Sequence, residues 1–348
     1  MKKALILSAF ILFSCNGRIY RTVYPLLNDG KYDSEFPYKN CSQEIKAICD
    51  MTVKIYCTTQ YKIYYFDRND KMTRRDIQER GLLHCQSTSF SENPIAGSGL
   101  VIASNSQSVL VLTCSHVVYH SDSLFTYYHE DQETRHRYIR TAAIKTGERL
   151  LAAGFPEDGV LQLLAHDPQA DIALIGRTWS KPLNRVINDF HYPLGKGAEL
   201  DWGSFVYLIG YPQGQLMVTK AIVSQPNRDG RGGFLIDSNF NRGFSGGIIL
   251  AIRDGVPNFE MVGIGSSTSG APEAILTPSP DAEYGMQVPY DGQPYVVSIN
   301  RINYGITFIV PSEAILEFLN KQRTLLKGTA YEANLATAFQ QSRPSAAP

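Results

Sequence analysis

The sequence has 348 residues, which is enough for one or two hydrophobic cores with additional extensions. Lysine plus arginine and aspartate plus glutamate both number 33, so the formal net charge is zero, which argues against a general nucleic-acid-binding protein. Charged residues make up only 19%, and tyrosine (20), glycine (28) and proline (18) are frequent. This composition is typical of a β-rich protein with long loops.

The N-terminal residues predict export. Two lysines precede an apolar stretch at 4–13, which is too short to span a bilayer. The stretch ends in Leu-Phe-Ser-Cys at 12–15, which resembles the lipobox of bacterial lipoproteins, where signal peptidase cleaves before a lipidated cysteine. We expect a signal peptide at 1–14, lipidation at Cys15, and a membrane-anchored lipoprotein on the periplasmic or surface face of the bacterial cell envelope. The alternative is an ordinary signal peptide with an incidental cysteine.

The remaining cysteines bear on disulfides and metals. Export implies an oxidising compartment, in which disulfide bonds form. Five cysteines follow Cys15, namely Cys41, Cys49, Cys57, Cys85 and Cys114. The first four could form two bridges of undetermined pairing, and the odd number leaves at least one thiol unpaired or paired between molecules. No cysteine or histidine spacing is typical of a zinc site, so the sequence predicts no metal and no cofactor.

Short β-rich runs alternate with turn residues over 98–176 and again over 204–311. This regular spacing predicts a barrel or sandwich. A stretch rich in proline and asparagine at 181–198 connects the two halves, and apolar periodicity predicts a helix at 312–322. The expected domains are an N-terminal extension (15–50) containing a short helix, a first β-barrel (51–190), a second β-barrel with a closing helix (191–325), and a disordered tail (326–348).

Three residues match the combination of side chains that nucleophilic catalysis by a serine requires. His116 lies in LTCSHVV, Asp171 in DPQADIALI and Ser245 in NRGFSGG, each beside a β run. A serine hydroxyl needs a histidine to take its proton, and that histidine needs a carboxylate to fix its tautomer. The negatively charged oxygen of the intermediate needs backbone N–H donors, and glycines permit the turn that points two of them at one spot.

Several motifs around these residues occur together in one family. GSGLVI (97–102), VLTCSHVV, LLAHDPQADIALI, VYLIGYPQG, VTKAIVS, FLIDSNFNRGFSGGIIL and GITFIVPSEAILEFL follow in that order over about two thirds of the chain. The chain therefore resembles trypsin-like serine proteases of the chymotrypsin fold, and most closely the bacterial high-temperature-requirement branch. The resemblance implies an all-β fold of two six-stranded antiparallel β-barrels with the catalytic residues between them, and a C-terminal helix. No peptide-binding PDZ module is expected after that helix.

The resemblance also implies roles for individual residues. His116 would be the general base, Asp171 would orient it, and Ser245 would be the nucleophile. The N–H groups of Gly243 and Ser245 would form the oxyanion hole. Asn239 would lie near the floor of the primary specificity pocket, where an amide disfavours lysine and arginine in the substrate.

The same resemblance implies that one strand binds the substrate backbone as an added strand. Its residues are Gly265, Ser266, Ser267 and Thr268. The expected function is that of a serine endopeptidase, a hydrolase acting on polypeptides through an acyl-enzyme.

Two features depart from the family pattern. Phe244 replaces the aspartate or asparagine usual before the serine, which excludes the trypsin mode of activation through an ion pair and could reshape the oxyanion loop. Insertions at 67–90 and 119–136 could shape the cleft. One alternative is therefore a weak or inactive protease-like lipoprotein that binds extended peptides, in which Phe244 fills the oxyanion hole and the Gly243 amide points away. An esterase that uses the same three residues is another.

Overall fold

The computed structural model describes residues 28–128, 137–278, 285 and 287–337. The predicted signal peptide and the lipidation site Cys15 lie outside the described residues. Within the described ranges, no helix is both long enough and apolar enough to cross a membrane.

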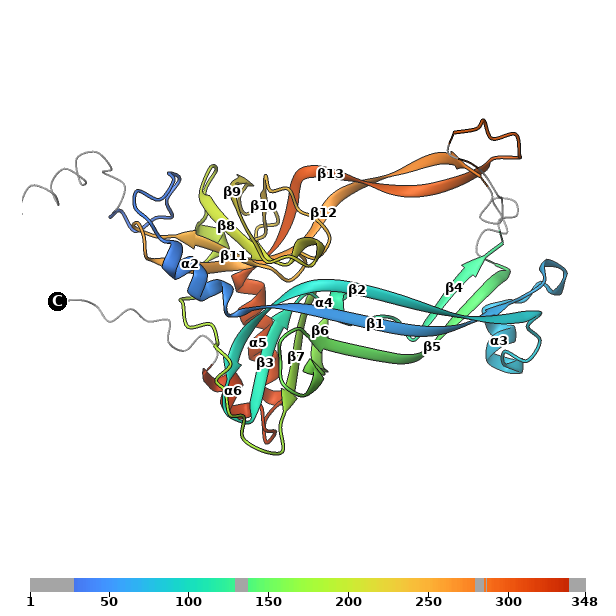
Figure 1. The fold of residues 1–348 in the computed structure, drawn as a ribbon, viewed down its shortest axis with the longest axis horizontal. Coiled ribbons are helices and arrows are strands. Elements are labelled where there is room, and N and C mark those ends of the chain that lie inside the picture. The colour runs from blue at the N-terminus through green and yellow to red at the C-terminus, as the bar shows by residue number, and fades with distance from the viewer. Residues whose placement is uncertain (1–27, 129–136, 279–284, 286, 338–348) are drawn as a thin grey trace, which may run out of the picture.

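The chain forms two antiparallel β units that lie side by side (Figure 1). The first is a seven-stranded sheet in the order β4-β5-β1-β2-β3-β7-β6. Its strands are β1 (Thr52–Tyr65), β2 (Ser87–Ser104), β3 (Ser108–Thr113), β4 (Ser123–Tyr127), β5 (Ile139–Ala152), β6 (Gln162–Asp167) and β7 (Ile172–Thr178). The predicted first barrel is thus a half-barrel sheet with one strand more than expected, because part of the 119–136 insertion forms β4 on the sheet edge.

The second unit is a closed six-stranded barrel in the order β10-β13-β12-β11-β8-β9, as expected. Its strands are β8 (Phe205–Gly210), β9 (Met217–Gln225), β10 (Phe234–Ile236), β11 (Ile248–Ile252), β12 (Phe259–Thr277) and β13 (Tyr295–Pro311). The all-β, chymotrypsin-like fold is therefore confirmed.

Alternating side chains along the central strands separate two cores. On β8, Val206 and Leu208 point into the closed barrel, whereas Tyr207 and Ile209 join the large core that the barrel shares with the first unit. Strands such as β3 and β11 are buried at every position, which explains their unbroken apolar runs. The shared core fixes one unit against the other, and the candidate site lies at this junction.

The helices are short. They are α2 (Ser42–Cys49), α3 (Arg74–Arg80), α4 (Ser115–Val118), α5 (Ser312–Leu325) and α6 (Glu332–Thr337), with 3-10 turns at Arg68–Asp70, Glu157–Gly159, Gly197–Glu199 and Pro212–Gly214. The short helix predicted in the N-terminal extension and the helix predicted at 312–322 are confirmed by α2 and α5.

The predicted disorder of the tail from residue 326 is wrong up to residue 337. Tyr331 and Asn334 are buried, and the Asn334 amide donates a hydrogen bond to the Ser108 hydroxyl at 2.8 Å. The tail was predicted to be disordered because its composition is rich in alanine and glutamine. Two buried side chains nevertheless hold α6 against the first unit.

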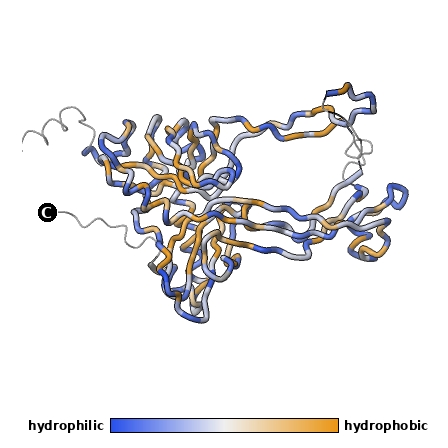
Figure 2. Tube along the Cα trace, in the orientation of Figure 1, coloured by the Kyte–Doolittle hydropathy of each residue, from blue (hydrophilic) through white to orange (hydrophobic). Residues whose placement is uncertain are grey.

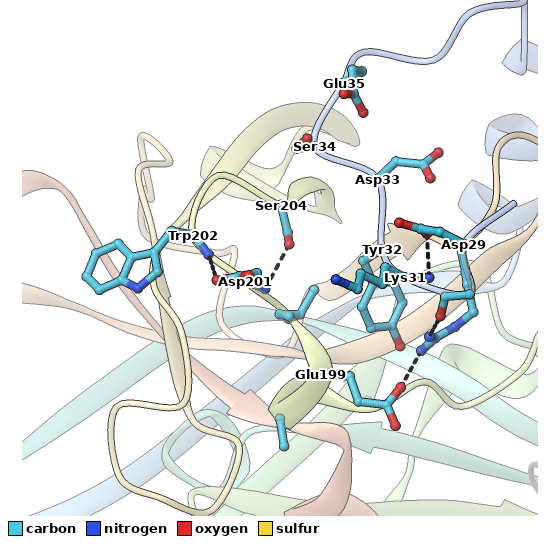
Figure 3. A pocket seen from close by; sticks show the side chains of 14 residues that line it. Asp29, Lys31, Tyr32, Asp33, Ser34, Glu35, Glu199, Asp201, Trp202 and Ser204 are labelled. Atoms are coloured by element: carbon cyan, nitrogen blue, oxygen red, sulfur yellow. Dashed lines mark hydrogen bonds and ion pairs between the residues drawn. The ribbon is translucent and has the colours of Figure 1, made fainter. Parts of the chain in front are cut away.

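The N-terminal extension is also anchored where the structure describes it. Tyr32 is buried on the second unit, where its hydroxyl donates to Glu260 at 2.7 Å and accepts from the Lys196 N–H at 2.8 Å. Arg253 lies over the Tyr32 ring, 4.0 Å from its centroid. Figure 3 shows this segment, 29–35, running beside Glu199 and the following loop.

Two long ribbons leave the body on the same side (Figure 1). One is the outer part of β12 and β13, in which 270–277 pairs with 295–302. The other consists of β1, β2, β4 and β5, closed by a small cluster of Phe66, Met72, Ile139 and Ala142. Hydrophobic residues are densest in the body, and the loop ends of the second ribbon are largely hydrophilic (Figure 2).

The disulfides expected from an exported chain are not formed among the described cysteines. Cys41, Cys49, Cys57, Cys85 and Cys114 are all free thiols. Cys41, Cys57 and Cys114 are buried at three separate places, namely before α2, on β1 and between β3 and α4.

Candidate active site

His116 and Asp171 form a tight pair at the junction of the two units. His116 lies on the four-residue helix α4, and Asp171 lies in the turn before β7 with φ of +56°. The His116 Nδ1 atom lies 2.9 Å from both carboxylate oxygens of Asp171, and the His116 backbone N–H donates to Oδ1 at 3.0 Å. Because the carboxylate holds both the ring and the backbone of His116, Nδ1 carries the proton and Nε2 is left as the basic nitrogen.

The surroundings of Asp171 keep its carboxylate ionised. Burial raises the pKa of Asp171, but hydrogen bonds from His116 and Ser266 lower it by more, so the net pKa lies below the usual value. The Ser266 hydroxyl donates to Oδ2 at 2.5 Å. A carboxylate that stays charged at neutral pH can stabilise the imidazolium that forms when His116 takes a proton.

Ser245 is joined to this pair through Ser266. Its hydroxyl donates to the Ser266 carbonyl oxygen at 3.0 Å, while the Ser266 side chain bonds Asp171. Among the hydrogen bonds of the described residues, none links Ser245 to His116. A change of the Ser245 side-chain rotamer redirects its hydroxyl, and catalytic hydrogen bonds often tighten only once substrate is bound.

A β-bulge gives Ser266 its two contacts. The register of β12 against β13 shifts between Gly265 and Ser267, so Ser266 is left out of the ladder. It was expected only as a substrate-binding residue, and its bond to Asp171 was missed. The sequence around 265–268 carries no signal for the bulge, since the shift depends on how β13 pairs.

The turn that holds Ser245 presents two unused backbone donors. The Arg242 carbonyl accepts from the Gln213 N–H at 2.9 Å. In a trans peptide the carbonyl and the next N–H point in opposite directions, so the Gly243 N–H points away from Gln213. In the part of the chain that the structure describes, neither the Gly243 nor the Ser245 N–H has an acceptor. Two free donors beside Ser245 are what an oxyanion hole requires.

Glycine is required at position 243. Its φ is +104°, and an added Cβ would collide with the Tyr211 carbonyl oxygen. The residue therefore has to be glycine for the turn to keep this shape.

Phe244 does not fill the oxyanion hole. Its side chain is 1% exposed and belongs to the core of the closed barrel, with its ring centroid 5.7 Å from that of Phe240. Burying a phenylalanine contributes about 1.5–3 kcal/mol, so hydrophobic packing anchors the turn here. The observation that would have favoured an inactive scaffold is absent from the described structure.

The residues expected to bind substrate differ in where they point. Asn239 is exposed, whereas Phe240, which sequence analysis missed, is buried against Gly265. Ser267 is exposed, and the Thr268 hydroxyl lies within hydrogen-bond distance of the Asn303 and Ile306 carbonyl oxygens, at 3.2 and 3.1 Å. Thr268 thus holds the β13 backbone with its side chain.

The backbone of β12 beyond Gly265 has an open edge. The β11–β12 ladder reaches Ile264, and from Ser267 onward β12 pairs only with β13 in the described ranges. The opposite edge of β12 therefore presents backbone groups beside the serine and can accept an added strand.

Residues 97–264 match the family model of a trypsin-like peptidase domain. The matched segment covers just under half of the chain. All three residues of the His116–Asp171–Ser245 set lie inside the matched segment, and the resemblance inferred from the motifs is confirmed. No curated protein matches the chain.

Solved structures similar to this chain include HtrA-type proteases. AlgW with a decapeptide has 16% identity and a TM-score of 0.44, covering 84% of this chain and 68% of its own. AlgW with a tripeptide has 15% identity and a TM-score of 0.42, covering 82% and 64%. A serine endoprotease from Yersinia pestis has 16% identity and a TM-score of 0.39, covering 82% and 67%. The chain thus spans about two thirds of the length of these structures.

Proposed function

We propose that the protein is a serine endopeptidase that cleaves polypeptides through an acyl-enzyme. The observation that carries the proposal is the hydrogen-bonded Asp171–His116 pair, joined through Ser266 to a serine whose turn leaves two N–H groups free. An esterase could use the same groups. The open β12 edge favours a peptide, because a polypeptide backbone can pair with it over several residues.

In the proposed reaction, Ser245 Oγ attacks the carbonyl carbon of the scissile bond while its proton passes to His116 Nε2. The carbonyl oxygen becomes negative and accepts hydrogen bonds from the Gly243 and Ser245 N–H groups. The carbon–nitrogen bond then breaks, and His116 returns the proton to the leaving amine. A water molecule, deprotonated by His116, releases the acid product and restores Ser245. Asp171 stays ionised throughout and stabilises the imidazolium.

The proposed location is the bacterial cell envelope, with a lipid on Cys15. The support is the sequence pattern at 1–15. Because residues 29–35 lie on the closed barrel, a tether at Cys15 would join the body on that side.

A fluorophosphonate probe tests the proposal directly. We expect it to label the purified protein once, on the peptide that contains Ser245, as read by mass spectrometry. The reason is that such probes react with serines activated by a neighbouring base. Ser224→Ala, on β9 and outside the site, is the matched control and should leave labelling unchanged. Folded protein that takes no label, or takes it on another serine, would contradict the proposal.

Gly243→Ala tests the oxyanion hole. We expect kcat for peptide hydrolysis to fall about 10²- to 10³-fold, the loss typical of removing one oxyanion donor. The alanine Cβ would meet the Tyr211 carbonyl oxygen and displace the N–H. Gly203→Ala is the matched control, because Gly203 also has a positive φ of +79° but no atom within 4 Å of an added Cβ. Equal activity of the two variants would exclude the Gly243 N–H as a donor.

A further inference from the structure

We propose that Cys57, His120 and Glu148 form a binding site for a divalent transition metal of the zinc type. The three come from β1, from the segment after α4, and from β5. The sequence predicts no metal site because these residues are far apart in the chain, but the sheet brings them together. Glu148 pairs with Thr59 across the β1–β5 ladder, and Cys57 lies on the same face of β1 as Thr59.

The distances suit a small, four-coordinate ion. His120 Nδ1 lies 3.7 Å from Cys57 Sγ and 3.7 Å from Glu148 Oε2, and the three ligand atoms all lie within 4.8 Å of one another. Zinc bonds of about 2.0–2.3 Å in a tetrahedron place neighbouring ligand atoms roughly 3.3–3.6 Å apart. A shift of a few tenths of an ångström would bring His120 Nδ1 to tetrahedral spacing from Cys57 Sγ and from Glu148 Oε2. A water molecule would be the fourth ligand of the ion.

The chemistry of the three side chains also matches. Thiolate, imidazole and carboxylate are the three side-chain ligand types that zinc uses in proteins. Cys57 is fully buried, whereas the Glu148 side chain is 25% exposed, which leaves an entry path for the ion. His120 Nε2 is buried with no hydrogen-bond partner in the described structure, so the ring is oriented by what its Nδ1 meets.

A hydrogen bond already occupies part of this space. The Thr59 hydroxyl lies 3.0 Å from His120 Nδ1 and 3.4 Å from Glu148 Oε2. Without metal, these contacts hold the cluster together. A bound ion would take over Nδ1, and the Thr59 hydroxyl could still donate to the carboxylate as a supporting partner.

The charges around the cluster balance a divalent ion. Lys145 Nζ lies 3.5 Å from Glu148 Oε2 and 3.1 Å from Asp122 Oδ1. With Cys57 as the thiolate, the two carboxylates and the thiolate give three negative charges against one ammonium. The net charge of −2 matches the ion, which would release the thiol proton to solvent on binding.

The site would brace the catalytic histidine. His120 lies four residues after His116 and two residues after the end of α4, and its carbonyl accepts from Lys145 Nζ at 2.9 Å. A metal at Nδ1 would tie the segment that follows α4 to β1 and β5. None of the three ligands belongs to the catalytic set, so the metal's role is structural. A second group, Cys114 with His116 and Asp171, is part of the active site, and its thiol already donates to the Gly265 carbonyl at 3.3 Å.

Cobalt(II) is the probe for this site, because it replaces zinc and reports its ligands by absorption. We expect the chelator-treated, reduced full chain to bind one cobalt ion with a thiolate-to-cobalt charge-transfer band and tetrahedral d–d bands, both lost on adding zinc. Cys57→Ala should abolish the charge-transfer band. Cys49→Ser, a partly buried cysteine outside the cluster, is the matched control and should keep it.

Glu148→Gln provides a readout that does not depend on a buried substitution. We expect zinc to raise the thermal midpoint of the unmodified protein and to raise that of Glu148→Gln much less, with at least a tenfold weaker apparent affinity. Circular dichroism would establish that the variants fold. A missing cobalt band, a band that survives Cys57→Ala, or equal zinc effects on the unmodified protein and Glu148→Gln would each overturn the proposal. None of these outcomes depends on protease activity.

Discussion

Ser245→Ala is expected to lower kcat for peptide hydrolysis by about 10⁶-fold, the loss seen when the nucleophile of a Ser-His-Asp set is removed. No other described hydroxyl stands in for it, because the neighbouring Ser266 hydroxyl donates to Asp171 and is held there at 2.5 Å. The measurement is the initial rate on an unstructured polypeptide and on a quenched fluorescent peptide.

The substitution should leave the fold intact, since it removes a single hydroxyl bonded to the Ser266 carbonyl. Ser224→Ala serves again as the matched control and should keep full activity. Residual cleavage within about tenfold of the unmodified enzyme would mean that Ser245 is not the nucleophile. Loss of activity in both variants would point to a folding defect.

The strands were predictable, and the three candidate catalytic residues could be named, because the signals are local. An apolar run such as β3 or β11 is buried over its whole length, so its sequence alone indicates a strand. The motifs around His116, Asp171 and Ser245 are each contained within a few residues. The structure brings the first two into contact and joins the third to them through Ser266.

The remaining features depend on pairings between distant segments. The Gly243 N–H is free because Gln213, thirty residues earlier, holds the Arg242 carbonyl. Ser266 reaches Asp171 because β12 bulges against β13. Neither pairing leaves a pattern in the residues next to the site, so sequence analysis could name the site but not its hydrogen bonds.

Phe244 is a sequence feature whose effect could not be predicted from the sequence. As a sequence feature it departs from the family and raised the question of a blocked oxyanion hole. Its effect depends on which way its side chain points, and the structure places it in the barrel core beside Phe240. An aromatic residue there replaces an ion pair with apolar packing, so the turn needs no newly formed amine to hold it.

Asp171→Asn is expected to lower kcat about 10⁴-fold at neutral pH, as the equivalent change does in the Ser-His-Asp template. An amide oriented to donate to His116 Nδ1 would move the ring proton to Nε2. The protonated Nε2 atom could then no longer accept the Ser245 proton. An amide in the other orientation would keep the tautomer but lose the charge that stabilises the imidazolium. The measurement is kcat and KM on one peptide substrate, with kcat carrying the loss.

The same variant has a stability signature with a defined sign. Because the folded-state pKa of Asp171 lies below its unfolded value, its contribution to stability is present above the unfolded pKa and is lost as the pH falls through the folded pKa. The difference in unfolding free energy between the unmodified protein and Asp171→Asn should therefore shrink as the pH drops into that acidic range. Asp237→Asn is the matched control, since its exposed side chain accepts from the Ile222 N–H at 2.8 Å, which an amide oxygen can also do. A kcat loss as large in Asp237→Asn, or none in Asp171→Asn, would remove Asp171 from the catalytic set.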